Sequence, residues 1–195
     1  MPIAFALNSR AARLRDRLTQ LAAAGDEDPS LLWAAVAIIL TPDPDSILLI
    51  RRAERIGDPW SGHMALPGGR REPADADLPA TAIREAAEEV GICLDRQFLV
   101  GSLHDVVPRT PVLPPIAVRP FVFVIDQRPP LRLNPEVASA SWVPVEQFLR
   151  ADSHHPVRLE IAGQIRQVQA YQLEDAIIWG MTERILTSFL DRLTD

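Results

Sequence analysis

The amino-acid sequence predicts an α/β fold in which a mixed β-sheet lies between layers of helices. Short apolar runs, typical of buried strands, alternate along the chain with longer stretches in which apolar residues recur at helical spacing. No internal repeat and no low-complexity tract interrupts this alternation. The chain has 195 residues, of which 47% are apolar, so we expect one domain with a substantial core.

The N-terminal segment predicts a helix followed by a linker. Over residues 8–24, three leucines recur at helical spacing, namely Leu14, Leu18 and Leu21. A short acidic stretch separates this helix from the first long apolar run. We therefore expect an N-terminal helix and linker over residues 1–29 and the main body over residues 30–195, within a chain that is a single domain overall.

Two buried strands and a long loop are expected next. The apolar runs Leu32–Leu40 and Ser46–Arg51 predict strands, and the prolines and aspartates of residues 42–45 predict the turn between them. Residues 52–77 follow as a long loop that is rich in proline and glycine around Trp60. Loops of this length inside a compact domain are usually functional, so we expect this one to contribute to a site.

A helix is predicted from Leu78 to Val90. Asp77 can cap its N-terminus, and Pro79 lies in the first turn, where proline is tolerated. Gly91 is a suitable stop, because glycine readily adopts the left-handed conformation that ends many helices.

Shorter patterns predict the remaining elements. These are a strand over Phe98–Val106, a proline-rich loop over residues 108–115, a strand over Ala117–Ile125 with a bulge or edge at Pro120, a short helix at Val145–Arg150 after residues 135–143, a hairpin of Val157–Ile161 and Ile165–Tyr171, and a helix over Ala176–Leu193.

Composition limits the classes of function. The net charge of −6 argues against a protein that binds nucleic acid without sequence preference. The longest apolar run, Leu31–Leu40, is too short to span a bilayer, and no signal sequence opens the chain, so a cytoplasmic location is expected. All twenty basic residues are arginine, whose forked donors suit phosphate. The single cysteine, Cys93, excludes an internal disulfide.

Three carboxylates are grouped on the helix over residues 78–90. Glu85, Glu88 and Glu89 are three and four residues apart, so they share one helical face. Like charges on one face weaken a helix, whereas Mg²⁺ takes oxygen ligands and often bridges carboxylates to substrate phosphates. A solvated acidic face is the alternative, but the preceding Arg84 and the upstream Gly-Gly loop favour a metal site.

The segment resembles the Nudix box, the signature of hydrolases that cleave a nucleoside diphosphate linked to another group. The second half of the box matches at every position, namely Arg84, Glu85, Ala86, Glu88, Glu89, Gly91 and Ile92. The first half departs, because fourteen residues separate Gly69 from Arg84 where the pattern has thirteen. The slot of the first glutamate holds Ala76, between Asp75 and Asp77, so that glutamate is missing, shifted or replaced by an aspartate. The resemblance implies an α/β/α sandwich with a mixed sheet.

Three further segments are similar to the coenzyme A pyrophosphatase branch of this family. They are residues 48–53 (LLIRRA), residues 61–69 (SGHMALPGG) and residues 178–182 (IWGMT). The resemblance implies cleavage of coenzyme A or a derivative to 3′,5′-ADP and phosphopantetheine. Ile50, Leu66 and the insert at residues 57–60 depart from the branch pattern, so ADP-ribose, a dinucleotide or a nucleotide sugar stays open as substrate. A non-catalytic ligand-sensing module is the rival from another class.

The resemblance also assigns roles to residues. Glu85, Glu88 and Glu89 are the expected ligands of Mg²⁺ or Mn²⁺, Arg84 orients them, and either Glu89 or Glu136 is the general base. Apart from the resemblance, arginines around the loop can hold phosphate bidentately, the tryptophan can stack on an adenine, and the Gly-Gly pair lets the backbone approach phosphate. The expected substrate-binding residues are therefore Arg52, Arg55, Trp60, Gly68, Gly69, Arg70 and Arg71.

Other residues are expected to lie outside the site. The histidines have no metal-ligand spacing to the glutamates, His154 and His155 are expected in a solvated loop, and Trp179 is expected in the core. The expected partner is a small nucleotide substrate rather than nucleic acid or a membrane, and a homodimer stays open.

Overall fold

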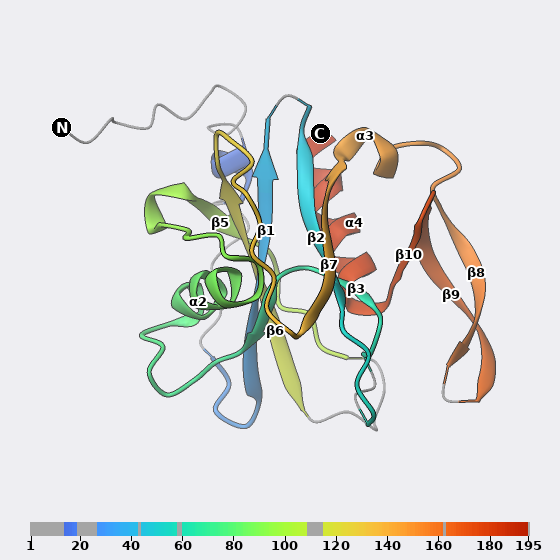
Figure 1. Cartoon of the computed structure of the whole chain (residues 1–195), viewed down its shortest axis with the longest axis horizontal. Coiled ribbons are helices and arrows are strands. Elements are labelled where there is room, and N and C mark those ends of the chain that lie inside the picture. Colours follow the sequence, from blue (N-terminus) through green and yellow to red (C-terminus); the bar gives the residue numbers. More distant parts are fainter. Residues whose placement is uncertain are drawn as a thin grey trace.

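The computed structural model describes residues 14–18, 27–42, 44–57, 60–108, 115–161 and 163–194. Figure 1 shows a central sheet with helix α2 (Leu78–Val90) on one side, and helix α4 (Gly180–Thr194) with a smaller sheet on the other. This arrangement confirms the predicted α/β fold with a mixed sheet between helical layers.

The larger sheet is mixed because its two long central strands are parallel while its other pairs are antiparallel. β1 and β6 stay in parallel register from Leu32↔Ile116 to Leu40↔Val124. The main path is β3-β2-β1-β6-β5, with β4 beside β1 and β7 beside β2. The strands are β1 (Leu32–Thr41), β2 (Ser46–Arg52), β3 (Met64–Ala65), β4 (Gly68–Arg70), β5 (Leu99–Ser102), β6 (Ile116–Val124) and β7 (Val137–Pro144).

Alternate residues of this sheet supply two hydrophobic clusters, one on each face. On the α2 side the sheet meets four buried residues of the helix, namely Leu78, Ala82, Ala86 and Val90. On the α4 side it meets Ile185, Leu186, Phe189 and Leu190. Burial of these apolar faces fixes both helices against the sheet.

The predicted strands β1 and β2 and helix α2 are confirmed. β1 and β2 pair antiparallel around residues 42–45. Helix α2 has the predicted bounds, the side chain of Asp77 accepts a hydrogen bond from the Ala80 N–H at 2.9 Å, and Gly91 is left-handed with φ 73°. Polar and glycine signals at both ends therefore set the helix limits.

Residues 14–18 are helical, and Leu14 and Leu18 are buried in the cluster on the α4 side. The rest of the helix predicted over residues 8–24, including Leu21, lies outside the described residues.

The prediction of one long loop over residues 52–77 is wrong, because β3 and β4 lie within it. β1 and β2 pair only at Leu40↔Ile47 and Thr41↔Ser46, so both strands have edges that still need hydrogen-bond partners. β3 supplies them to β2, and β4 supplies them to β1. The remaining loop of residues 53–63 is correspondingly shorter.

Two other predictions need correction, and one segment for which no element was predicted is a strand. The strand predicted over Phe98–Val106 is a short 3₁₀ helix (Arg96–Phe98), then β5, then an isolated bridge between Val106 and Val118. Residues 135–143 are mostly strand β7, which pairs with β2. Pro120 marks neither an edge nor a bulge of β6, which is a central strand. β5 ends opposite Phe121, so the missing N–H of Pro120 removes no pairing there, and its carbonyl accepts from Leu103.

The C-terminal helix begins four residues later than predicted. Residues 176–179 are strand β10 (Ala176–Trp179), because they are rich in β-branched and aromatic side chains and pair with β9. The predicted hairpin is confirmed with longer strands, β8 (His154–Ile161) and β9 (Gln164–Leu173), so His154 and His155 begin a strand rather than lie in a loop. The predicted helix at residues 145–150 is α3 (Val145–Phe148). No helix within the described ranges is long and apolar enough to cross a membrane.

Candidate active site

The Gly68-Gly69 pair brings the backbone of β4 against both β1 and helix α2. Gly68 pairs with Val36 and Gly69 with Ala35. A Cβ on Gly68 would lie 2.3 Å from the Ala35 carbonyl oxygen, and a Cβ on Gly69 would lie 2.2 Å from Oε1 of Glu85. Glycine is required at residue 68, where a Cβ would meet backbone, and at residue 69 a Cβ would displace the Glu85 carboxylate. The glycine pair therefore sets the carboxylates of α2 directly against the β4 backbone.

Glu89 is the most buried of the three carboxylates. Glu89 is 2% exposed, and its Oε2 accepts a hydrogen bond of 2.9 Å from the Gly68 N–H. Burial raises the pKa of Glu89 to about 7, against the opposing effect of the Gly68 N–H, and the neighbouring charge of Glu85 adds to the rise. The charges of Arg52 and Glu136 also act on Glu89, so both lie near it.

Arg84 binds the other two carboxylates. Its Nη1 donates to Oε1 of Glu85 at 2.9 Å and to Oε2 of Glu88 at 3.0 Å, and its Nη2 donates to the Arg70 carbonyl at 3.0 Å. Burial raises the pKa of Glu85, while Arg84 opposes the rise. Arg84 therefore lies between the carboxylates it was predicted to orient.

Asp75 holds Arg84 from the other side, and the sequence left its role open. Its two carboxylate oxygens accept from Nε and Nη2 of Arg84 at 3.0 and 3.1 Å, and also from the Thr81 hydroxyl and the Glu72 N–H. Hydrogen bonding by Arg84 lowers the pKa of Asp75 to about 2, against the effect of burial. Glu72, the candidate for a shifted glutamate, approaches Arg84 only to 3.9 Å and is exposed. Of the three alternatives, replacement by an aspartate therefore fits the contacts best.

Glu136 is placed across the site on the residues that precede β7. Its carboxylate accepts from Nη1 of Arg55 at 3.0 Å, and its carbonyl accepts from the Ala53 N–H at 2.8 Å. Its charge raises the pKa of both Glu85 and Glu89. Two residues with separate predicted roles, Arg55 for phosphate and Glu136 as base, are thus paired with each other.

The remaining predicted substrate residues are spread around this centre. Arg70 is exposed, whereas Arg71 pairs with Glu27 and donates to the carbonyls of Asp75 and Ala76, so its guanidinium is engaged within the loop before α2. Trp60 is half-buried and its carbonyl accepts from His63. The fold thus brings Arg52, Arg55 and Glu136 close to the carboxylates of α2. The guanidinium of Arg71 instead makes contacts that stabilise the loop before α2.

The donors fit a hard divalent cation in their chemistry. Glu85, Glu88 and Glu89 offer oxygen ligands, and burial of two of them against each other makes a neighbouring cation favourable. Within the described ranges, no three histidine, cysteine or acidic side chains are grouped closely enough to hold a metal as they stand. The contacts explain this, because Arg84 draws Glu85 and Glu88 to itself while Glu89 binds the Gly68 N–H.

Two residues that were not predicted to belong to the site, Arg51 and Trp179, contact the loop of residues 53–63. Arg51 donates to the Gly62 carbonyl at 3.3 Å and to the Asp175 carbonyl at 3.2 Å. The ring centroids of His63 and Trp179 lie 4.8 Å apart. Trp179 is half-buried and belongs to neither hydrophobic cluster, so it contacts this loop rather than lying in the core as predicted. The similarity of residues 61–69 and 178–182 to the coenzyme A pyrophosphatase branch was the sequence signal for this contact.

Comparison with known proteins identifies relatives. Residues 31–162 match the NUDIX domain family. The chain is 34% identical over 150 residues to the uncharacterized Nudix hydrolase NudL of Photorhabdus laumondii, covering 76% of this chain and 77% of that protein. It is 32% identical over 158 residues to NudL of Salmonella paratyphi B, covering 77% and 76%. A 39% identical match to an uncharacterized protein of Schizosaccharomyces pombe covers 58% of this chain but only 36% of that protein.

Solved structures share the fold at lower identity. A MutT/nudix family protein from Enterococcus faecalis superposes with a TM-score of 0.64 at 17% identity, covering 96% of this chain and 75% of that one. The NUDIX domain of Shewanella oneidensis NrtR, complexed with ADP ribose, gives a TM-score of 0.52 at 20% identity, covering 64% and 82%. At these identities the likeness concerns the fold alone.

Proposed function

The chain belongs to the Nudix family, whose hydrolases act on pyrophosphate bonds, and from this premise we propose that its substrate is coenzyme A or a coenzyme A derivative. Cleavage of the diphosphate would release 3′,5′-ADP and phosphopantetheine. The enzyme class rests on the family, and the substrate rests on the residues around the loop of residues 53–63.

One observation carries the choice of substrate. The three segments that resemble the coenzyme A pyrophosphatase branch are far apart in the sequence, yet they contact one another. Arg51, in residues 48–53, binds the carbonyl of Gly62, in residues 61–69, and His63 packs on Trp179, in residues 178–182. If the three similarities had arisen by chance, the segments would not be expected to lie in contact. Their contact therefore favours a shared role beside the carboxylates.

Glu85, Glu88 and Glu89 would hold Mg²⁺ or Mn²⁺. When bound, such an ion neutralises charge on the diphosphate and makes the attacking water more acidic. Arg84, held by Asp75, orients the carboxylates of Glu85 and Glu88.

The other residues bind substrate or move the proton. Arg52, whose charge acts on Glu89, and Arg55, which pairs with Glu136, suit phosphate oxygens. Arg70, the exposed last residue of β4, is a further candidate. Glu89 or Glu136 accepts the proton of the attacking water. Glu136 is half-exposed and reachable by water, whereas Glu89 is buried on Gly68, so the geometry favours Glu136.

Hydrolysis of ADP-ribose is the second candidate. The NrtR domain that shares this fold was solved with ADP ribose, and the same carboxylates would serve either diphosphate. A dinucleotide, a nucleotide sugar and a non-catalytic sensing role are the remaining alternatives. A cytoplasmic location and a homodimer stay predictions from the sequence.

A substrate comparison tests the proposal. Purified protein with Mg²⁺ or Mn²⁺ is given coenzyme A, ADP-ribose, NADH and nucleotide sugars, and the products are identified by mass. We expect preferential release of 3′,5′-ADP from coenzyme A. Preferential turnover of another compound would reject coenzyme A but keep the chemistry, and metal binding without turnover of any compound would favour a sensor.

Glu88→Gln and Glu89→Gln test the metal ligands, with Glu146→Gln on α3 as the matched control. We expect each of the two ligand variants to weaken Mn²⁺ binding by about 10–100-fold and to lower turnover by at least as much. Mn²⁺ affinity, measured by calorimetry, gives a readout that is independent of activity. Turnover and Mn²⁺ affinity within a few-fold of the wild type would show that the ligand assignment is wrong.

A further inference from the structure

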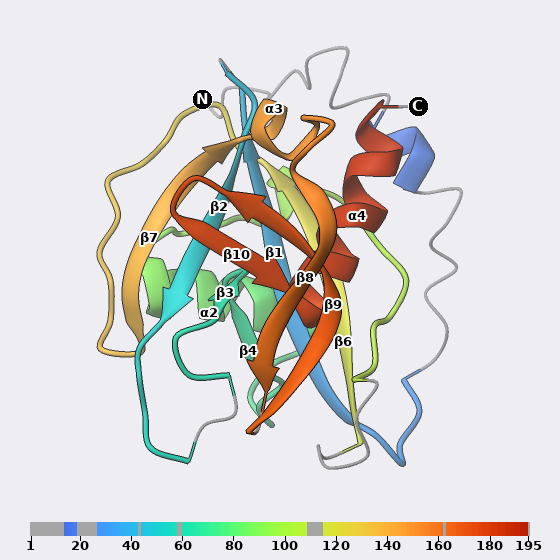
Figure 2. The same ribbon diagram turned by 90° about the vertical axis from the view of Figure 1, so that its right-hand side faces the viewer.

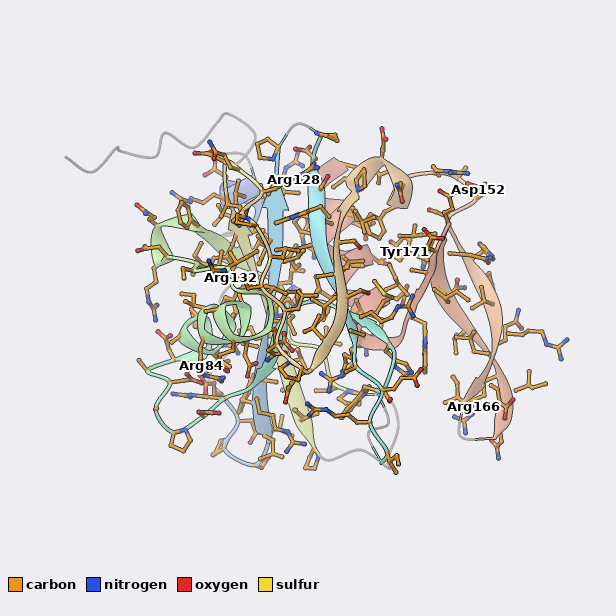
Figure 3. All side chains as sticks on the ribbon, viewed as in Figure 1. Arg84, Arg128, Arg132, Asp152, Arg166 and Tyr171 are labelled. Carbon is orange, nitrogen blue, oxygen red and sulfur yellow. The ribbon has the colours of Figure 1, made fainter. Side chains whose placement is uncertain are left out.

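Among the described strands, β8 is an edge of a sheet that projects from the body of the protein. Figures 1 and 2 show the β8–β9 hairpin extending past α4, and Figure 3 places Arg166 of this hairpin on the opposite side of the molecule from Arg84. The sheet order is β10-β9-β8, so among the described strands β8 pairs with β9 alone. Its outer edge therefore presents backbone groups that another strand can bind.

The register of the hairpin identifies which backbone groups point outward. The Ser153 carbonyl accepts a hydrogen bond of 2.7 Å from the Gln172 N–H, and the pairing continues in register to Ile161↔Gln164. Backbone groups alternate in direction along a strand, so residues 155, 157, 159 and 161 face β9, and residues 154, 156, 158 and 160 face the open edge. Pro156 agrees with this assignment, because a proline in a strand is tolerated where its missing N–H faces outward.

The side chains of β8 are arranged symmetrically about Leu159. Arg158 and Glu160 flank it on one face of the sheet, and both are exposed. Val157 and Ile161 flank it at the next positions on the other face, where they and Leu159 are half-buried. Opposite charges and matched apolar residues thus stand at equal distances from one central residue.

We propose that β8 pairs antiparallel with β8 of a second copy of this chain, about a two-fold axis at Leu159. Arg158 of each copy then lies opposite Glu160 of the other, and Val157 lies opposite Ile161. Residues 158 and 160 both turn their backbone groups to the edge, so each of these pairs also exchanges two backbone hydrogen bonds. The result is a closed, isologous dimer with a continuous six-stranded sheet.

The side chains select this register over its neighbours. An axis at residue 158 sets Arg158 against its own copy, and an axis at residue 160 does the same for Glu160, so like charges meet. An axis at residue 157 sets Pro156 opposite Arg158, so the missing N–H falls in a pair next to the axis, whereas the proposed axis leaves Pro156 three residues from the centre. Proline and charged residues can also keep edge strands apart. The charges of β8 differ in sign and complement each other across the two-fold axis, so here they favour pairing.

Charge reversal tests the pairing. Sedimentation velocity over micromolar to millimolar concentrations follows the wild type, Arg158→Glu, Glu160→Arg and the control Glu174→Arg, which changes an exposed residue in the β9–β10 turn of the same sheet. We expect a wild-type dimer that the control retains. Each single variant sets like charges against each other twice, so its dimer should weaken by at least about tenfold.

Mixing the two weakened variants gives the sharper result. In a mixed pair, the copy that carries Arg158→Glu presents two acidic side chains to the two arginines of the copy that carries Glu160→Arg. An equimolar mixture should therefore form heterodimers at concentrations where each variant alone is monomeric. The double exchange Arg158→Glu/Glu160→Arg should also dimerise as the wild type does. A wild type that stays monomeric throughout, a dimer that both single variants leave intact, or a mixture without heterodimers would overturn the proposal.

Discussion

At the scale of single residues, Asp75 is the carboxylate on which the position of Arg84 depends. It accepts two hydrogen bonds from Arg84, one from Thr81 and one from the Glu72 N–H, and it is 8% exposed. One aspartate therefore ties the loop before α2 to the arginine that binds Glu85 and Glu88.

The low pKa of Asp75 predicts an acid-dependent part of the stability. Hydrogen bonding by Arg84 lowers the pKa of Asp75 from 3.8 to about 2 in the folded state. The stabilisation from the ionised carboxylate is thus fully present above about pH 4 and is lost as the pH falls towards 2. Asp75→Asn should lower the free energy of unfolding near neutral pH by about 1–3 kcal/mol and reduce its fall below pH 4.

Urea unfolding at a series of pH values measures both effects. Asp126→Asn, at an exposed position after β6, is the matched control and should follow the wild type. A variant at Asp75 whose stability runs parallel to the wild type between pH 5 and pH 2 would contradict the assigned role of the carboxylate.

The Arg55–Glu136 pair allows the general base to be tested separately from the ion pair. If Glu136 accepts the proton of the attacking water, Glu136→Gln should lower kcat by about 10²–10⁴-fold. Arg55→Gln breaks the same ion pair, whose two side chains are about half exposed, but leaves the carboxylate in place, so it should act mainly on KM. Equal losses of kcat in both variants would mean that Glu136 matters only as the partner of Arg55.

The sequence could predict some of these residues but not their contacts. The spacing of Glu85, Glu88 and Glu89 on one helix follows from local geometry, and so does the neighbouring Arg84. The role of Asp75 and the pairing of Arg55 with Glu136 depend on segments that meet only in the folded chain, and no local pattern encodes such contacts.

At the scale of elements, the two glycines of β4 have different tasks. A Cβ on Gly68 meets backbone atoms of β1, at 2.3 Å from the Ala35 oxygen and 2.6 Å from the Val36 Cα, whereas a Cβ on Gly69 meets the carboxylate of Glu85. Backbone cannot move aside, but a glutamate side chain can.

Alanine at each glycine should therefore give a different loss. Gly68→Ala should destabilise the fold, because β4 must leave its register with β1, and its urea midpoint should fall clearly. Gly69→Ala should keep a midpoint near the wild type but displace Glu85, and so weaken Mn²⁺ binding and turnover by about tenfold or more. Gly163→Ala is the control, because a Cβ there meets no atom within 4 Å while φ is 76°. Its loss of stability therefore measures the cost of a left-handed backbone without any steric clash. Equal stability losses at Gly68 and Gly69 would contradict the distinction.

Elements with strong local signals were predicted best. Helix α2 has an N-cap, a first-turn proline and a glycine stop, and its bounds agree with the prediction at both ends. β3, β4 and β7 are short or partly exposed and are stabilised by pairing with β1 or β2, so their sequences gave little sign of a strand. The residues of β10 are predicted to be helical because their apolar side chains lead directly into the helical pattern of α4.

At the scale of the whole molecule, the C-terminal elements lie against the loop of residues 53–63. Arg51 joins that loop to the β9–β10 turn, and Trp179 packs on His63. Arg52 follows Arg51 directly, and its charge acts on Glu89. The contacts of Arg51 therefore fix the position of the candidate site relative to the hydrophobic cluster on the α4 side. The α/β class followed from the alternation of patterns, but this docking could not be derived from it.

The N-terminal segment gives the last prediction, which concerns whether residues 1–29 are separable from the rest. Leu14 and Leu18 are 3% and 0% exposed, and both belong to the same cluster as Leu186 and Phe189 of α4. The packing is close, since a Cβ on Gly101 of β5 would lie 2.6 Å from the Cβ of Leu18. We therefore expect the segment around Leu14 and Leu18 to contribute to folding rather than to act as an appendage.

Leu18→Ala should accordingly lower the free energy of unfolding by about 2–5 kcal/mol, the usual cost of removing a buried leucine side chain. Asp16→Ala, two residues away and exposed, is the control and should change it by less than about 0.5 kcal/mol. A protein of residues 30–195 loses both leucines, so its loss should exceed that of Leu18→Ala alone. If urea unfolding gave this shortened protein the midpoint and slope of the full chain, residues 1–29 would be an independent appendage, and the single-domain prediction would be wrong.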